Sequence, residues 1–408
     1  MTNNFHFTLP AFELKTLAVK LTSVGERSVR NHHPWIFSES VEKLSKEGSP
    51  GDICVIFSHT KNKVIGVGLY DPQSPIRIKM LHFDHGAQLN AEFFSEKISA
   101  AYALRQRLLQ TNTNSYRLLF GENDGFPGLI ADVYDNVLVV KLYSAIWFPY
   151  FEVILKALIE VCHCDCAVLR LSRSLQQAPQ YELTDGTILF GTLVDEVVPF
   201  LEHGVRFSAN VIKGHKTGYF LDHRENRRQV GKLSKGMKVL DVFSYAGGFS
   251  VHALAGGAKE VTSLDISKQA LELALENGKL NDYSGNHYVI AGDAFTELER
   301  LISEKKKYNI VVIDPPSFAK SAKEAAIARK KYAQLAQLGV QLTASNGLLV
   351  LASCSSRILA VDFFRINTEA LKESGRGFQL ENKTYHDVDH PIGFPEGAYL
   401  KCGYYRIQ

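Results

Sequence analysis

The stretch Val239 to Ser250 reads VLDVFSYAGGFS and decides the class of fold. Its apolar first half predicts a buried strand, and the pair Gly247 and Gly248 predicts a turn into a helix over 248–255. Glycine allows a tight turn and lets a ligand approach a helix N-terminus. The stretch lacks the full G-x-G-x-x-G pattern, and similar turns occur in α/β folds that bind no ligand. It therefore predicts an α/β fold and leaves the ligand open.

Strands and helices continue to alternate after this stretch. Strands are predicted at 239–243, 260–265, 287–291, 310–314 and 347–353, with helices at 248–255, 268–281 and 320–342. Such alternation is typical of a parallel sheet flanked by helices. The pattern begins after Gly204, and we assign it to a domain over 201–408.

The first half of the chain has a different pattern. Short apolar runs and turns alternate over 12–83, which predicts a small β-barrel or sandwich. A small α+β unit is predicted from a helix at 91–110, strands at 129–134 and 137–143, a helix at 147–161 and strands at 167–171 and 188–198. We therefore expect three domains, at 1–88, 89–200 and 201–408.

Composition excludes several classes of protein. The chain has 408 residues, 45% hydrophobic and 22% charged, as expected of a globular protein with two to three domains. No apolar run approaches the roughly 18–20 residues of a membrane span, and the N-terminus lacks a secretory signal, so we expect a cytoplasmic protein without membrane contact. Six scattered cysteines predict free thiols. A net charge of +3 means that any nucleic-acid binding must depend on local charge.

Three successive predicted strands end in or just before a carboxylate, at Asp241, Asp265 and Asp293. Open parallel sheets bind ligands at this carboxyl edge, where Asp265 can accept hydrogen bonds from both hydroxyls of a ribose. No lysine follows the glycine pair, and Asp241 would repel a pyrophosphate. The residues therefore favour a nucleoside with a cationic or neutral 5′ group. The alternative is that the three carboxylates only cap helices.

Residues 314–320 read DPPSFAK, and with the three carboxylates they resemble the S-adenosylmethionine site and D-P-P motif of class I methyltransferases. Stretches similar to the bacterial large-subunit ribosomal RNA cytosine-C5 methyltransferase family are HPWIF at 33–37, FGENDGFPGL at 120–129, GHKTGYFLDHR at 214–224 and ASCS at 352–355. The resemblance extends from residue 21 to residue 401. It implies an N-terminal PUA-type β-barrel, a small α+β middle domain and a Rossmann-like class I methyltransferase domain.

The resemblance also implies S-adenosyl-L-methionine as cofactor and large-subunit ribosomal RNA as partner. The residues expected to bind the cofactor are Asp241, Phe243, Tyr245, Ala246, Gly247, Asp265, Asp293, Asp314 and Phe220. The residues expected to contact RNA are Arg27, Arg30, His33, Trp35, Lys216, Asp222, Arg224, Pro315 and Phe318. A second copy of the chain is kept as a further candidate partner, and no metal is expected.

Cys354 and Asp314 are the predicted catalytic residues. Cytosine C5 is a poor nucleophile, so a methyltransferase commonly first adds a thiolate to C6, and the resemblance assigns that thiolate to Cys354. Asp314, expected at the same sheet edge, would hydrogen-bond or protonate the N3 and N4 side of the base. Pro315 and Pro316 stiffen the turn between them. The alternative is that Cys354 is a small buried apolar residue.

Ser317 departs from the wider group of RNA cytosine-C5 methyltransferases, many of which have a second cysteine directly after the prolines. Without that second cysteine, the group that takes the C5 proton is left open. The same fold also methylates other atoms, such as guanine N7 or an exocyclic amine, for which no nucleophile is needed. We predict 5-methylcytidine formation in ribosomal RNA, with that alternative and a non-catalytic RNA-binding assembly factor as competitors.

Two charged regions are candidates for RNA contact. In the loop 210–228, the Lys-Thr-Gly sequence resembles the part of the family's site that approaches cofactor and substrate, whereas the alternative is a solvated loop with a weak Asp222–Arg224 pair. Near the N-terminus, the cations and the aromatic ring suited to gripping phosphate and stacking on a base are Arg27, Arg30, His32, His33 and Trp35. Trp35 is more readily explained as a core residue of the barrel.

Two further clusters are given structural interpretations. The basic stretch 320–331 and the triplet Lys305–Lys307 either line a groove or form a solvated face, and we favour the solvated face for the triplet. Cys162, Cys164 and Cys166 lack both the spacing and the distant partner pair of a structural zinc site. We expect this run to lead into a strand.

Overall fold

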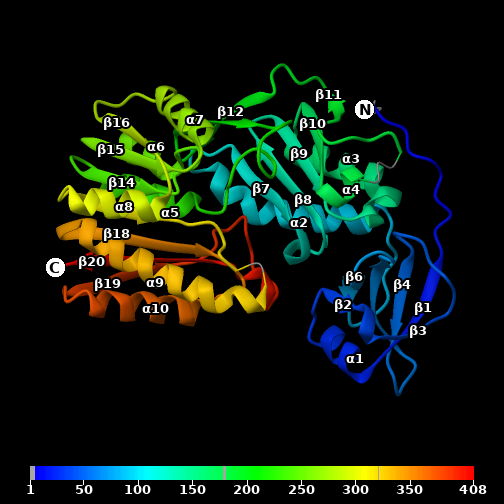
Figure 1. The fold of residues 1–408 in the computed structure, drawn as a ribbon. Coiled ribbons are helices and arrows are strands. Elements are labelled where there is room, and N and C mark those ends of the chain that lie inside the picture. Colours follow the sequence, from blue (N-terminus) through cyan, green and yellow to red (C-terminus); the bar gives the residue numbers. More distant parts are fainter. Residues whose placement is uncertain (1–4, 178–180, 320) are drawn as a thin grey trace. The chain divides into compact units, whose positions relative to one another are not determined.

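The computed structural model describes residues 5–177, 181–319 and 321–408 (Figure 1). The chain divides into two compact units. Unit 1 comprises residues 1–201, 208–221 and 388–397, and unit 2 comprises residues 202–207, 222–387 and 398–408. The strand pair β12 (Val197–Glu202) and β13 (Val205–Asn210) contains residues of both units. Neither unit is one continuous segment, which the sequence pattern did not predict. The domain limits of 1–88, 89–200 and 201–408 stay a prediction.

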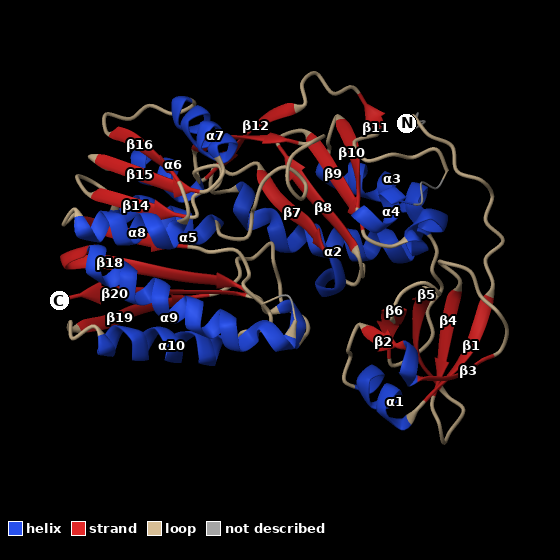
Figure 2. Cartoon of the chain, in the orientation of Figure 1, coloured by secondary structure: helices blue, strands red, loops and turns tan. Residues whose placement is uncertain are grey.

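The N-terminal part of unit 1 is a six-stranded sheet in the order β2-β6-β5-β4-β1-β3 (Figure 2). Its elements are β1 (Thr16–Leu21), α1 (Ser23–Arg30), β2 (Trp35–Phe37), η1 (Ser38–Ser40), β3 (Val41–Leu44), β4 (Ile53–Phe57), β5 (Val64–Tyr70) and β6 (Ile76–Phe83). Alternate residues of β1 are buried, and Leu17, Val19 and Leu21 enter the core. This is the period of two of a strand with one buried face. The β-rich N-terminal domain is therefore confirmed.

The rest of unit 1 is built on a five-stranded sheet in the order β11-β10-β9-β8-β7. Its elements are α2 (Ala91–Leu109), β7 (Ser115–Phe120), η2 (Gly121–Asp124), β8 (Leu129–Tyr134), β9 (Val137–Leu142), η3 (Ala145–Tyr150), α3 (Phe151–Cys162), β10 (Cys166–Leu171), α4 (Arg173–Gln177) and β11 (Ile188–Gly191). The helix predicted from residue 147 begins at Phe151, because Pro149 lies in a preceding 3-10 turn. The strand predicted at 188–198 is wrong as a single strand, since β11 ends at Gly191.

The cysteine-rich run leads into a strand, as interpreted from the sequence. Cys166 is the first residue of β10, and Cys164 is buried in the apolar core beneath it. Within the ranges that the structure describes, no three His, Cys, Asp or Glu side chains are grouped so as to hold a metal ion. None of the helices in these ranges has the length and apolar character of a membrane span.

Unit 2 is a seven-stranded sheet in the order β16-β15-β14-β17-β18-β20-β19, covered by helices on both faces (Figure 2). The strands are β14 (Lys238–Val242), β15 (Glu260–Asp265), β16 (Asn286–Ala291), β17 (Tyr308–Ile313), β18 (Thr343–Cys354), β19 (Phe378–Thr384) and β20 (Leu400–Ile407). The helices are α5 (Arg224–Leu233), α6 (Gly248–Ala255), α7 (Lys268–Lys279), α8 (Ala294–Ser303), α9 (Ala325–Leu342) and α10 (Ala360–Glu373), with 3-10 turns η4 (Ala322–Glu324) and η5 (Pro395–Gly397), the latter in unit 1.

The predicted parallel sheet is confirmed for five of these strands. β14 pairs in parallel with β15 and β17, β15 with β16, and β17 with β18. The sequence did not predict that β20 runs antiparallel to β18, or that β19 runs antiparallel to β20. The helix predicted from residue 320 begins at Ala325, and Lys320 itself lies outside the described residues.

The unit 2 sheet is buried on both faces along its central strands β14 and β17. Along β14, Leu240 and Val242 pack into one apolar cluster, whereas Val239 packs into another. The same alternation separates Val311 from Val312 in β17. A strand buried on both faces has a continuous apolar sequence, which explains why these strands could be found. The carboxyl ends of the parallel strands meet at one edge of the sheet, where ligands of such folds bind.

Candidate functional site

The turn after β14 has an unusual backbone. Phe243 and Tyr245 have φ values of 65° and 45°, in the left-handed region that side chains other than glycine rarely adopt. Gly247 has a φ of 77°, and a Cβ atom there would lie 2.7 Å from Cβ of Ala274. The turn is held by hydrogen bonds, one of which runs from the amide of Ser244 to the carbonyl of Leu264 at 3.0 Å. Such strained backbone is concentrated at ligand sites.

Asp241 precedes this turn and has an incompletely satisfied carboxylate. Its Oδ2 atom accepts hydrogen bonds from the amide of Ser250 at 3.0 Å and from the hydroxyl of Ser250 at 2.7 Å. Its Oδ1 atom is buried and has no donor among the described residues. Burial raises the pKa of Asp241 to about 7. Because a buried acceptor without a partner is costly, this oxygen fits a hydrogen-bond donor or a positive charge on a ligand.

Asp265 and Asp293 lie farther along the same edge. Asp265 ends β15 and accepts from the amide of Tyr245 through Oδ2 and from the amide of Ser267 through Oδ1, each at 2.9 Å. Asp293 is the N-cap of α8 and accepts from the amide of Thr296 at 3.1 Å. Helix capping thus describes Asp293 well, as the alternative interpretation held. A carboxylate has about four acceptor positions, so these bonds leave capacity for ribose hydroxyls.

Asp314 follows β17 and faces His223, a contact that the sequence did not indicate. Nε2 of the buried His223 lies 3.3 Å from Oδ1 of Asp314. Burial lowers the pKa of His223, but the contact with Asp314 and the charges of Asp314 and Asp222 together outweigh burial, so the net direction is upward. The residue stands directly after Asp222 in the DHR sequence, which is the only signal that could have drawn attention to it.

A second set of hydrogen bonds orients the imidazole of His223. Oδ1 of Asn226 accepts from the hydroxyls of Thr384 at 2.5 Å and Tyr404 at 2.9 Å, so its Nδ2 atom is the donor toward Nδ1 of His223 at 3.1 Å. Nδ1 is then the acceptor nitrogen, and the hydrogen of the neutral ring is on Nε2. The N–H group of His223 is therefore on the nitrogen that lies 3.3 Å from Asp314, although the contact does not have the geometry of a hydrogen bond.

Cys354 ends β18, beside the strand that leads to Asp314. Its Sγ atom lies 3.8 Å from the carbonyl oxygen of Pro315. Burial, followed by the charges of Asp314 and Asp222, raises the pKa of Cys354 to about 12. The thiol is half-buried and not part of the apolar clusters, so the interpretation as an ordinary core residue does not describe it. Its raised pKa means that the free protein holds this sulfur as a thiol.

Lys401 is a second residue near Cys354 that the sequence did not indicate. It lies on β20 opposite Ser353, and its buried ammonium group donates to the carbonyls of Ser355 and Tyr399. Burial lowers the pKa of Lys401 to about 8. Its charge favours the thiolate form of Cys354, in opposition to the two aspartates. The cation comes from a strand that pairs with β18 only in the folded chain.

The alternative of a solvated loop does not describe Arg224, because its guanidinium is buried and lies 3.3 Å from Asp387. Asp222 accepts a hydrogen bond from the hydroxyl of Tyr399 at 3.0 Å. The guanidinium of Arg224 is buried rather than exposed at a surface for RNA.

The loop after the prolines is held by aromatic packing. The ring of Phe318 lies 5.2 Å from that of Tyr332, and the ammonium of Lys331 lies over Phe318 at 5.0 Å. The Tyr332 hydroxyl in turn accepts from Ser353, the residue before Cys354, at 2.9 Å. Ser317 donates to the carbonyl of Ala319 at 3.2 Å. The loop and the end of β18 are thus linked, with a hydroxyl at position 317.

Lys216 and Phe220 belong to unit 1, whereas the residues of the carboxyl edge belong to unit 2. Lys216 has a φ of 60°, and its carbonyl accepts from the ammonium of Lys141 at 3.0 Å. The ring of Phe220 is 38% exposed. Unit 2 brings together the turn residues 243–247, Asp241, Asp265, Asp314 and Cys354. The roles of Lys216 and Phe220 stay predictions.

The residues predicted to contact RNA near the N-terminus lie in two places, on α1 and next to Glu396 and Glu122. Arg27 and Arg30 are exposed on α1, where Arg30 binds Glu26 at 2.6 Å. Nε2 of His33 lies 3.2 Å from Glu396.

Trp35 is not a core residue of the barrel, and that interpretation is wrong. It is half-buried, lies outside the apolar cluster of the barrel, and donates from its indole to Glu122 at 3.0 Å. Its ring lies 5.0 Å from that of Phe394. Trp35 therefore links the barrel to the rest of unit 1 through Glu122 and Phe394. β2 has only three residues, and the ring lies at the edge of the barrel rather than in its core.

Comparison with known proteins gives consistent matches over the whole chain. Residues 117–396 match an S-adenosylmethionine-dependent methyltransferase family, and residues 19–83 match a PUA-like domain. A ribosomal RNA large subunit methyltransferase of Deinococcus radiodurans is 39% identical over 405 residues, covering 98% of this chain and 99% of the relative. Ribosomal RNA large subunit methyltransferase I of Erwinia tasmaniensis is 35% identical, covering 95% and 98%.

Two solved structures share the fold. One is a proposed S-adenosylmethionine-dependent methyltransferase of Streptococcus mutans, with a TM-score of 0.80, 21% identity, and coverage of 95% of this chain and 99% of that one. The other is a proposed methyltransferase complexed with S-adenosylhomocysteine, with a TM-score of 0.80, 22% identity, and coverage of 96% and 100%. The arrangement of a methyltransferase fold with a PUA-like β domain is thereby shown.

Proposed function

Because the chain belongs to the S-adenosylmethionine-dependent methyltransferase family, and within it to the large-subunit ribosomal RNA methyltransferases, we propose that it forms 5-methylcytidine in that RNA through Cys354. The cofactor is S-adenosylmethionine. The observation that carries the proposal is the placement of a half-buried thiol, Cys354, and a carboxylate, Asp314, after two neighbouring parallel strands. A covalent cytosine methyltransferase needs these two groups near each other.

The residues of the carboxyl edge fit the cofactor. Asp241 offers a buried oxygen without a donor, and Asp265 has acceptor capacity for a ribose. The backbone of residues 243–247 forms the strained turn between them. When bound, the cofactor supplies an activated methyl group and a positive sulfonium. A positive charge suits a site with several carboxylates and no neighbouring lysine after the glycine pair.

Cys354 and Asp314 have separate tasks in this proposal. The thiolate of Cys354 forms a bond to C6 of cytosine, and the electron pair of the C5–C6 double bond becomes available at C5 for the methyl group. Loss of the C5 proton to a base and elimination of the thiolate from C6 then restore the double bond and free the enzyme. Asp314 binds the N3 and N4 side of the ring, where charge accumulates, and His223 keeps its carboxylate oriented. The proton of Cys354 must leave first; the charges of Asp314 and Asp222 oppose this loss, whereas the charge of Lys401 favours it.

Two observations favour a second candidate function. The pKa of Cys354 is raised to about 12, and position 317 holds a serine in place of a second thiol. Both features are compatible with methylation of another RNA atom, such as an exocyclic amine, which needs no nucleophile. Asp314 and the prolines would then bind the amine itself.

Trapping of the covalent adduct tests the proposal. RNA that contains 5-fluorocytidine cannot lose a proton from C5, so a methylated adduct should stay attached to the enzyme. We expect a denaturant-stable complex of protein and RNA that requires S-adenosylmethionine, and we expect its loss in Cys354→Ala. Cys162→Ala, a half-buried cysteine of unit 1, is the matched control and should form the complex. An adduct in Cys354→Ala, or none in the wild type with active methyl transfer, would contradict the proposal.

A further inference from the structure

A row of aromatic rings runs through unit 2 from the loop after the prolines to the end of β19. Its members, in order, are Phe318, Tyr332, Phe363, Phe364 and Tyr385, and the centres of successive rings lie 5.2, 5.4, 5.7 and 6.2 Å apart. The three middle rings are buried on α9 and α10, which lie side by side (Figure 2). The last ring, that of Tyr385, is 52% exposed. The aromatic row therefore ends in a ring that is open to solvent and supported by a buried neighbour.

Tyr385 lies at the same edge of the sheet as Cys354. Thr384, the last residue of β19, pairs with Cys402 of β20, and Cys402 pairs with Ala352 of β18, two residues before Cys354. Neighbouring strands are about 4.8 Å apart, so about 10 Å separates Tyr385 from the end of β18. A base that contacts Tyr385 therefore belongs to a nucleotide close to the one that contacts Cys354.

Three exposed cations accompany the aromatic row. The ammonium groups of Lys331 and Lys383 lie over the rings of Phe318, at 5.0 Å, and Phe364, at 4.7 Å. Arg357 is exposed in the turn that follows β18. Within the described part of the chain, none of these three side chains has a hydrogen-bond or ion-pair partner. Their charges are therefore left for a ligand.

Acids on α10 and β19 are already paired with other cations. Asp362 binds Arg329 at 2.9 Å and Arg365 at 3.2 Å, and Glu381 binds Arg406 at 2.8 Å. These carboxylates do not neutralise the three cations of the aromatic row. The surface therefore has local positive charge, which attracts a polyanion although the whole chain is nearly neutral.

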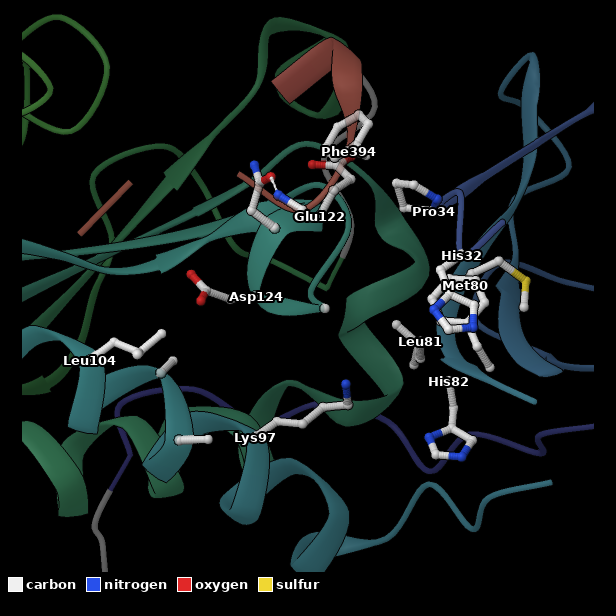
Figure 3. A pocket seen from close by; sticks show the side chains of 16 residues that line it. His32, Pro34, Met80, Leu81, His82, Lys97, Leu104, Glu122, Asp124 and Phe394 are labelled. Carbon is white, nitrogen blue, oxygen red and sulfur yellow. Dashed lines mark hydrogen bonds between the residues drawn. The ribbon is translucent and has the colours of Figure 1, made fainter. Parts of the chain in front are cut away.

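A cavity of about 550 Å³ in unit 1 does not offer the same combination (Figure 3). The carboxylates Glu122 and Asp124 belong to its lining together with Lys97. Met80 in its wall is 1% exposed and is part of the core of the barrel, so its side chain is not open to a base. A polyanion meets negative charge in this cavity, and the surface of unit 2 suits RNA better.

We propose that the RNA strand with the reacting cytidine continues over this surface of unit 2, where the base of a flanking nucleotide stacks on Tyr385 and neighbouring phosphates contact the three cations. Aromatic rings beside cations bind single-stranded RNA in this way, because every base has a π-face and every linkage carries a negative charge. Leu359 and Val361, 63% and 71% exposed at the start of α10, add apolar contact area. The identities of the RNA and of the reacting base rest on the proposed function.

Substitutions at Tyr385 test the stacking contact in the full-length protein. The dissociation constant for an unmodified large-subunit ribosomal RNA transcript is measured by filter binding in the presence of S-adenosylhomocysteine. We expect Tyr385→Ala to raise it about tenfold, and Tyr385→Phe, which keeps the ring, to leave it unchanged. Tyr288→Ala is the matched control, since Tyr288 is 51% exposed on the edge strand β16 of the same unit. Unchanged affinity for S-adenosylhomocysteine in all three variants shows that unit 2 is folded.

The salt dependence of binding tests the phosphate contacts. For a single strand, each phosphate contact contributes about 0.7 to the slope of the logarithm of affinity against the logarithm of salt concentration. Lys383→Gln should therefore make this slope shallower by about 0.7. Lys372→Gln, at an exposed lysine in the last turn of α10, is the matched control and should keep the slope of the wild type.

Two results would overturn this surface as the RNA contact. One is equal RNA affinity in Tyr385→Ala and Tyr288→Ala, or a loss in Tyr385→Phe as large as that in Tyr385→Ala. The other is an equal salt slope in Lys383→Gln and Lys372→Gln. These measurements need no methyl transfer, so they decide this proposal even if the methylated atom proves not to be cytosine C5.

Discussion

Asp241→Asn tests two effects of the buried carboxylate: its pH-dependent effect on the free energy of unfolding and its contribution to cofactor binding. The folded protein holds the pKa of Asp241 at about 7, against an ordinary value of 3.8, because the group is buried. The folded state therefore keeps a proton that the unfolded state releases, and stability falls as the pH rises from about 4 to about 7. The shift corresponds to about 4 kcal/mol in all, of which about 2–3 kcal/mol falls between pH 5 and pH 8.

Asparagine cannot ionise, so Asp241→Asn should lose this part of the pH dependence. The variant still accepts from Ser250, and any constant cost of its new amide group cancels between the two pH values. We therefore expect the difference in free energy of unfolding, variant minus wild type, to increase by about 2–3 kcal/mol from pH 5 to pH 8. Urea denaturation without cofactor measures it. The variant should also bind S-adenosylmethionine more weakly, because the proposed cofactor site loses a carboxylate that can balance a positive charge.

Asp293→Asn is the matched control for this experiment. The side chain is exposed and caps α8, and asparagine is an equally good N-cap. Its free energy of unfolding should stay close to that of the wild type. An unchanged pH dependence in Asp241→Asn, or cofactor affinity equal to that of the wild type, would refute the role assigned to this carboxylate.

Three further predictions concern Cys354 and His223 in unit 2 and Trp35 in unit 1. The rate of adduct formation with 5-fluorocytidine RNA should rise continuously between pH 6.5 and pH 9, because burial holds the pKa of Cys354 near 12; a plateau below about pH 8 would argue against a thiol that must first lose its proton. His223→Leu should lower kcat by about 10–100-fold with unchanged affinity for S-adenosylhomocysteine, while His223→Gln, which keeps an N–H donor, should recover most of it; equal rates in both variants would show that the donor to Asp314 is unimportant. Trp35→Phe should lower the free energy of unfolding of unit 1 by about 1 kcal/mol through loss of the bond to Glu122, as measured by urea denaturation, and no loss would contradict this linking role.

The sequence predicted those parts of the fold that depend on neighbouring residues. The strands ending near Asp241 and Asp314 could be found because strands buried on both faces have largely apolar sequences. The return of segment 388–397 to unit 1 could not be found, since it depends on contacts such as Asp389 with the amide of Arg117 at 3.0 Å. The sequence near either residue does not indicate such a contact between distant parts of the chain.

In the candidate site, too, residues within local motifs could be predicted, whereas residues brought in from distant parts of the chain could not. Asp314 and Cys354 stood out through their motifs, whereas His223 and Lys401 did not. His223 acts on Asp314 across 91 positions of sequence, and Lys401 reaches the end of β18 from β20, which pairs with it antiparallel. The interpretation of Trp35 as a core residue was wrong because it was based only on the apolar ring. The strand β2 has three residues, and the ring lies outside the core of the barrel.

Nucleoside mass spectrometry of the methylated RNA tests the central claim most directly. An unmodified large-subunit ribosomal RNA transcript is incubated with the wild type or with Cys354→Ala and isotope-labelled S-adenosylmethionine, then digested to nucleosides. We expect label in 5-methylcytidine for the wild type and none for Cys354→Ala. Label in any other nucleoside, or undiminished 5-methylcytidine with Cys354→Ala, would contradict that claim.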